Sequence, residues 1–164
     1  MTIIPFNPEI LQRHFSSNTR LACRSCKRFG NVPCCPPALP NIDEYRELFQ
    51  LASKGILIYQ QYAVDKKTWK SNWQELGRKS SIELADKLRE LKKSFSNSLI
   101  YGAGSCKECS HCTYLCSKPD KMIIPIEATG INVVNFFKEI TGIQLRFPVW
   151  EYGTFFRVGV LLYD

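Results

Sequence analysis

The chain has 164 residues, of which 45% are hydrophobic and 12% aromatic, so its composition is that of one globular domain rather than of a disordered segment. No apolar run approaches the roughly 20 residues that a membrane helix needs, and the first residues lack the basic and apolar regions of a secretory signal. We therefore expect a cytoplasmic protein without a membrane partner.

The formal charge of +7 by itself invites a nucleic-acid partner. That count treats all eight cysteines as neutral. If the eight bound two [4Fe–4S]²⁺ clusters as thiolates, the net charge would fall to about +3, which is ordinary for a soluble domain. We therefore do not favour nucleic acid as a partner.

The N-terminal region of the chain predicts little regular structure before its first helix. The first forty residues are basic and punctuated by prolines, which indicates an irregular segment. Asn41 or Asp43 can cap a following helix, and Lys54-Gly55 would end it. Apolar side chains alternate with polar or aromatic ones over 56–64, as expected for a strand.

The middle of the chain predicts a strand–helix–strand unit. Apolar and charged side chains occupy opposite faces over about 73–95, which indicates a long amphipathic helix. A second short strand is expected at 98–102. Together with the strand before the helix, this is the pattern of a parallel crossover. A further helix fits 132–140, with Gly142 as its stop.

The C-terminal region predicts two strands, 143–150 and 154–163, paired across Glu151-Tyr152-Gly153. The expected fold class is α+β, as a single small domain over residues 1–164. In this fold a mixed sheet is packed by helices, and two cysteine-rich loops, at about 20–40 and 102–121, bind clusters.

The stronger cysteine motif runs from Cys106 through Cys109 and Cys112 to Cys116. Its spacing, C-x₂-C-x₂-C-x₃-C, is the one with which bacterial ferredoxins hold [4Fe–4S] clusters. Each iron needs a thiolate, and two-residue gaps let one tight loop reach three corners of the cluster. In ferredoxins a proline directly follows the fourth cysteine, whereas here Pro119 comes three residues later.

Zinc is the alternative for this loop, because Cys₄ and Cys₃His sites are common and His111 lies within it. Zinc ligands usually come as two separated pairs, so three cysteines with successive two-residue gaps favour an iron–sulfur cluster.

The second constellation has Cys23 and Cys26 two residues apart, followed by the adjacent Cys34 and Cys35. Two groups of four thiols are most simply the eight ligands of two [4Fe–4S] clusters. A thioredoxin-like pair is disfavoured, because Cys23 and Cys26 are not set between a strand and a helix. Adjacent side chains in an extended chain point to opposite sides. Cys34 and Cys35 would therefore not easily serve one cluster, and one of them would bind the other cluster or remain a free thiol.

These blocks, followed by the segment Pro-Ile-Glu-Ala-Thr-Gly-Ile-Asn-Val at 125–133, resemble a family of prokaryotic proteins. It is the family of predicted metal-binding proteins of the domain-of-unknown-function 2284 (DUF2284) type, and the resemblance runs from about Leu21 to the C-terminus. It implies metal binding by every cysteine except Cys34, and an anaerobic or archaeal setting is common for such proteins. Ser117 stands where members often have arginine, and Asn132 where they tend to have aspartate.

Three classes of function remain open. Electron transfer, by a ferredoxin-like carrier or a small subunit with a redox partner protein, is favoured because no phosphate loop, dinucleotide fingerprint, catalytic triad or radical-SAM motif is present. The second is an enzyme with an open-coordination cluster, since seven usable ligands would leave one iron exposed. The third is a zinc-stabilised nucleic-acid-binding module.

Overall fold

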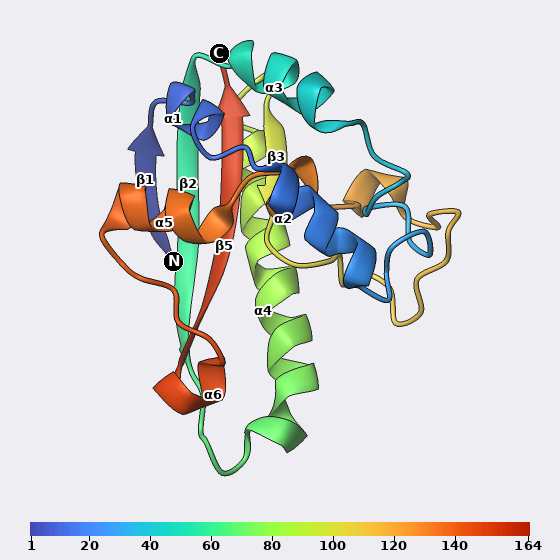
Figure 1. Ribbon diagram of the computed structural model, residues 1–164, viewed down its shortest axis with the longest axis vertical. Coiled ribbons are helices and arrows are strands. Elements are labelled where there is room, and N and C mark those ends of the chain that lie inside the picture. The colour runs from blue at the N-terminus through green and yellow to red at the C-terminus, as the bar shows by residue number, and fades with distance from the viewer.

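The computed structural model, which describes residues 1–164, is built on a five-stranded mixed sheet in the order β1-β2-β5-β3-β4 (Figure 1). The strands are β1 (Thr2–Phe6), β2 (Lys54–Ala63), β3 (Leu99–Gly102), β4 (Ile124–Pro125) and β5 (Thr154–Tyr163). The helices are α1 (Glu9–Gln12), α2 (Ser17–Ala22), α3 (Ile42–Gln50), α4 (Trp69–Lys92), α5 (Val133–Thr141) and α6 (Val149–Tyr152). Single turns of 3₁₀ helix occupy Cys23–Ser25, Pro119–Lys121 and Ile126–Thr129. This confirms the α+β class and the single small domain.

Two long strands form the centre of the sheet. β2 and β5 are ten residues each and pair antiparallel over their full length, from Lys54 opposite Tyr163 to Ala63 opposite Thr154. β1 flanks β2, β3 flanks β5, and the short β4 pairs parallel with β3 at the far edge. β2 and β3 therefore run in the same direction with β5 between them. The predicted crossover through α4 exists, but it joins strands that are not neighbours.

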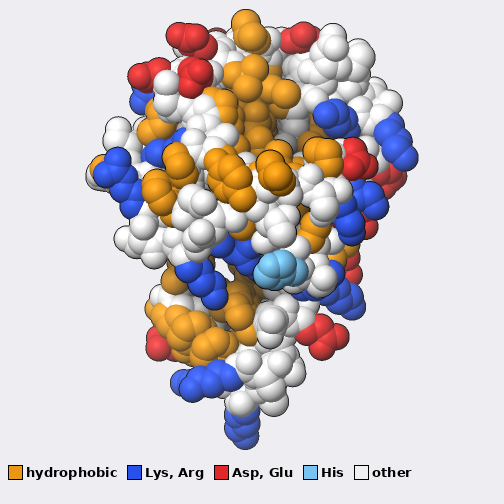
Figure 2. All heavy atoms as spheres, turned by 90° about the vertical axis from the view of Figure 1, so that its right-hand side faces the viewer, with side chains coloured by type: hydrophobic (Ala, Val, Ile, Leu, Met, Phe, Trp, Pro, Cys, Tyr) orange, Lys and Arg blue, Asp and Glu red, His pale blue; other side chains and the backbone are white.

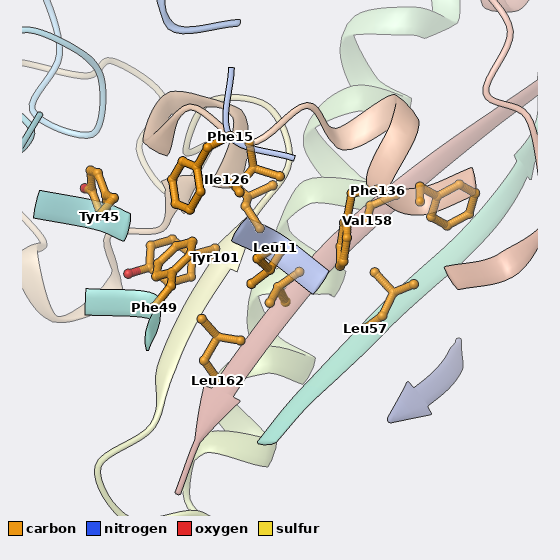
Figure 3. Packing of buried hydrophobic residues seen from close by; sticks show 13 residues of the cluster. Leu11, Phe15, Tyr45, Phe49, Leu57, Tyr101, Ile126, Phe136, Val158 and Leu162 are labelled. Atoms are coloured by element: carbon orange, nitrogen blue, oxygen red, sulfur yellow. The ribbon is translucent and has the colours of Figure 1, made fainter. Parts of the chain in front are cut away.

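The alternation of side chains along the central strands divides the core between the two faces of the sheet. Leu57, Val158 and Val160 join the larger cluster, which α1, α3 and α5 cover on one face (Figures 1 and 3). Ile58 and Leu161 join the smaller cluster against α4 on the other face. Each of these side chains is fully or almost fully buried, and each such burial contributes about 1.5–3 kcal/mol.

Two of the predicted helices begin at asparagine caps. The Asn41 side chain accepts a hydrogen bond from the Glu44 N–H at 3.0 Å, and the Glu44 carboxylate accepts one from the Asn41 N–H at 2.7 Å, which completes a capping box at the start of α3. Asn132 accepts from the Asn135 N–H at 3.1 Å at the start of α5. Gly142 ends α5 with φ of 74°, as predicted.

The predicted hairpin at the C-terminus is wrong. Residues 143–148 form no strand, and Val149–Tyr152 form the short helix α6. The reason is that β5 already has a partner on each side, β2 and β3, so no hydrogen-bonding edge remains for a third strand.

The prediction of an irregular N-terminal segment is also wrong in part. Thr2–Phe6 form an edge strand, where Pro5 is tolerated because one side of the strand needs no ladder hydrogen bond. Lys54 and Gly55 do not end the helix but begin β2, and α3 ends at Gln50.

α4 is the longest helix, and no helix of the chain is long and apolar enough to cross a membrane.

The contact between α4 and β5 depends on a glycine in the strand. A Cβ on Gly159 would lie 2.9 Å from the Leu88 Cδ1 and 3.1 Å from the Leu84 Cδ1, so the helix can approach the sheet this closely only at a residue without a side chain. Gly77, in α4 itself, is different: a Cβ there would meet the Arg157 Nη2 at 3.6 Å, an ordinary contact.

We predict opposite effects for alanine at these two glycines. Gly159→Ala should lower the free energy of unfolding by about 1–3 kcal/mol, because the methyl group overpacks the α4–β5 contact. Gly77→Ala should leave it unchanged or raise it by up to about 1 kcal/mol, because alanine favours the helix. Urea unfolding of both variants measures this, and equal stability of Gly159→Ala and the wild type would contradict the packing.

Candidate metal centre

The two cysteine loops lie together on one side of the molecule, beside the β3–β4 edge of the sheet (Figure 1). The first connects α2 to α3 and the second connects β3 to β4. They approach each other at Cys34, where the backbone N–H of Cys106 lowers the pKa of the Cys34 thiol. The fold therefore brings both predicted loops into one region.

Cys23, Cys26 and Cys35 form one group, which we call the inner thiols. A 3₁₀ turn after α2 places Cys23 and Cys26 close together, with the Cys26 N–H donating to the Cys23 carbonyl at 3.0 Å. Burial raises the pKa of the Cys23 thiol, Arg20 opposes this, and the charges of Glu127 and Cys26 add to the rise. The charges of Cys26 and Cys23 also act on Cys35, so all three thiols lie within electrostatic reach of one another.

Cys34 and Cys35 are in contact, with their sulfurs 4.0 Å apart, but they belong to different surroundings. Cys34 is 1% exposed, and its thiol lies against the second loop. The pKa of Cys34 is lowered, first by the hydrogen bond with Cys35 and then by the Cys106 N–H and the charge of Arg28, although burial opposes this. The same hydrogen bond raises the pKa of Cys35. One proton is thus shared by the pair and lies mainly on Cys35, and a metal bound there would release it.

Cys106, Cys109, Cys112 and Cys116 form the second group, the outer thiols. Burial raises the pKa of the Cys112 thiol, and the charges of Cys34 and of the other three outer thiols raise it further. All four thiols are partly exposed. His111, the alternative zinc ligand, is exposed within the same loop.

The donor chemistry of both groups fits an iron–sulfur cluster. No three Cys, His, Asp or Glu side chains converge around one point as the ligands of a single ion would. Each group nevertheless consists of thiols, the usual ligand for each iron of a [4Fe–4S] cluster. The inner thiols number three and the outer thiols four, with Cys34 between them.

A cavity of about 1140 Å³ distinguishes the two groups by their position. The three inner thiols lie in its wall, whereas Cys34 and the outer thiols do not. The wall also includes parts of α2, α5, α6 and β5 and the turn after β4. Figure 2 shows the side of the molecule that carries the cysteine loops, where hydrophobic and Lys or Arg side chains border a hollow.

Glu127 is the only carboxylate in the cavity wall. Its Oε1 accepts a hydrogen bond from the Gly104 N–H at 2.6 Å. Its Oε2 is enclosed by protein and has no hydrogen-bond partner. Burial raises the pKa of this carboxyl, and the Gly104 N–H and the charge of Arg157 oppose the rise.

Arg157, from β5, supplies a cation to the same wall. Its guanidinium donates to the Ser80 Oγ at 3.0 Å, the Ala103 carbonyl at 3.1 Å and the Gly77 carbonyl at 2.8 Å. Burial lowers its pKa, and it forms no salt bridge with a carboxylate. Neither Arg157 nor Glu127 was a predicted site residue. The signals available in the sequence were a lone arginine in the mainly apolar β5 and the place of Glu127 within the segment 125–133, which carries the family resemblance.

Comparison with known proteins identifies a family that is described as metal-binding. One family model matches the chain over residues 10–163, and that family is described as "Predicted metal-binding protein (DUF2284)". No curated protein and no solved structure matches the chain. Because the match covers nearly the whole chain, the protein belongs to the DUF2284 family of predicted metal-binding proteins.

Proposed function

We propose that this chain is an iron–sulfur redox protein that holds two [4Fe–4S] clusters, an inner one that acts on a small molecule and an outer one that exchanges electrons with a redox partner protein. The observation that carries the proposal is the position of the inner thiols in the wall of a large cavity. A simple electron carrier, the expectation from sequence, has no need of such a cavity. Pockets of this kind more often bind small molecules.

The residues divide between the two clusters by their surroundings. Cys23, Cys26 and Cys35 would hold the inner cluster, and as three thiolates they would cap three of its four irons. A cluster held in this way would supply a Lewis acid and an electron to a bound molecule. The outer thiols would hold the other cluster at the surface, where a partner can reach it. Cys34 lies against the outer loop and would not be a ligand of the inner cluster.

The chain's own groups would prepare the inner site. The mainly hydrophobic wall excludes water from the bound molecule. Burial favours the protonated form of Glu127, so this carboxyl keeps a proton to a higher pH than an exposed glutamate would. Oε1 accepts from the Gly104 N–H, so the proton would lie on Oε2, which is enclosed by protein.

The metal content tests the proposal directly. Protein purified without oxygen should contain about eight iron and eight sulfide per chain. Cys35→Ala and Cys109→Ala should each lose about half of the iron, because each removes a ligand of a different cluster. Cys34→Ala should keep most of it. Stoichiometric zinc without sulfide would contradict the proposal.

Access of small ligands tests the assignment of the inner cluster. Cyanide or imidazole should shift the electron paramagnetic resonance signal of the reduced wild type, because one iron is open. The shift should persist in Cys109→Ala, which keeps the inner cluster, and disappear in Cys35→Ala. A wild-type spectrum that ignores both ligands would instead support the electron carrier.

The buried carboxyl of Glu127 gives a pH dependence of stability. Its pKa is higher in the folded than in the unfolded chain, so the folded state binds the proton more tightly. Stability should therefore decrease as the pH rises through the unfolded value of about 4.3 toward the raised folded value, and level off above it. We expect urea unfolding between about pH 5 and 8 to show this decrease in the wild type and a smaller one in Glu127→Gln. Glu90→Gln, at an exposed residue paired with Lys87, is the control and should behave as the wild type.

A further inference from the structure

The cavity beside the inner thiols has an aromatic wall. Its aromatic lining residues are Phe29, Trp73, Phe147, Trp150, Phe155 and Phe156. The volume of about 1140 Å³ exceeds the roughly 300–1,000 Å³ of ordinary ligand pockets. The cavity thus has room for an organic molecule with an apolar body next to a metal centre.

Part of this wall is a rigid, flat surface. The Trp150 ring stacks on the Trp69 ring with centroids 3.9 Å apart and an interplanar angle of 7°, so α6 is held against the start of α4. Phe147, three residues before Trp150, is 65% exposed. Covering an exposed phenylalanine in a cavity wall removes apolar surface from water, which is favourable, and a flat apolar molecule would cover it.

The charged groups of the wall are mostly arginines. Arg28, Arg146 and Arg157 come from three different segments, and Glu127 is the only acidic residue among the lining residues. Three thiolates on a [4Fe–4S]²⁺ cluster would add about one negative charge, so positive charge remains in excess. The cavity therefore favours an anion.

Arg146 is the arginine best placed for that anion. It is exposed, lies next to Phe147 and forms no hydrogen bond or salt bridge. Its guanidinium lies over the Tyr152 ring, 5.5 Å from the centroid, at the border with a smaller cavity that Arg146 and Tyr152 both line. Stacking of this kind fixes the plane of the guanidinium and leaves its N–H donors free, the arrangement that binds carboxylate or phosphate through two bonds.

We propose that this cavity binds an organic anion, a carboxylate or phosphate ester with a flat aromatic or similar apolar body. The anionic group binds Arg146, and the body lies against Phe147 and the aromatic wall. The proposal rests on the proposed function, because it names the class of molecule that would be presented to the inner cluster.

Calorimetric titration of the anaerobically purified holoprotein tests this. The probes are 2-naphthoate, 2-naphthyl phosphate and the neutral 2-naphthamide. At least one anion should bind about tenfold tighter than the amide, since a charge-assisted hydrogen bond is worth about that factor or more. Arg146→Gln should remove this preference and leave the affinity for the amide unchanged. Phe147→Ala should weaken the binding of every probe.

Two controls use residues outside the cavity. Arg46→Gln changes another exposed arginine that lies over an aromatic ring, that of Phe15, and should not affect binding. Leu51→Ala removes a side chain that is 74% exposed and should not affect it either. Equal binding of anion and amide, an unchanged preference in Arg146→Gln, or no binding of any probe would overturn the inference. Iron and sulfide analysis of the same samples shows separately whether the proposed clusters are present.

Discussion

The arrangement of the cavity depends on one partly buried guanidinium. Arg157 sits in the central strand β5, and its N–H groups bind α4, through Ser80 and Gly77, and the end of β3, through Ala103. All three acceptors are neutral, so the charge is stabilised by dipoles and hydrogen bonds rather than by a counter-ion, and each such bond to a charged group contributes about 1.5–3 kcal/mol. Burial makes these bonds obligatory, because a guanidinium without partners in this position would cost several kcal/mol. The cation therefore joins α4 to the sheet at the point where the second cysteine loop begins.

At the start of that loop, Gly104 is in close contact with both Arg157 and Glu127. Gly104 has φ of 77°, and a Cβ there would lie 2.9 Å from the Arg157 Nη1, so both the backbone conformation and the space demand glycine. The N–H of the same residue donates to Glu127, which in turn acts on the inner thiol Cys23. Arg157, Gly104 and Glu127 thus connect the sheet to the outer loop and to the inner thiols. A substitution at any of these three residues would therefore alter the surroundings of both cysteine groups.

Local patterns explain which parts of this structure the sequence predicts. The long helix α4 follows from its two-sided pattern over many turns, and α5 follows from the Asn132 cap and Gly142. The C-terminal hairpin failed because strand order is a long-range property: the segment 143–148 reads as a strand only while the second edge of β5 is assumed to be free. Glu127 and Arg157 escaped prediction for a similar reason. Each is ordinary in its own segment and becomes unusual only when the fold brings the two residues, 30 positions apart in the chain, to the same cavity.

The positions of the adjacent cysteines, Cys34 and Cys35, follow partly from the local sequence pattern and partly from the fold. Alternation of side chains predicts that Cys34 and Cys35 face apart, and the fold places one with the outer loop and the other with the inner thiols. If each group holds a cluster, Cys34 lies between them, joined to the inner ligand Cys35 by one peptide bond and with its sulfur 4.0 Å from that of Cys35. This position suits electrons that enter at the outer loop and leave at the cavity. It gives Cys34 a role without making it a ligand of the inner cluster, and it explains why a site for a small molecule would need a second, outer group of thiols.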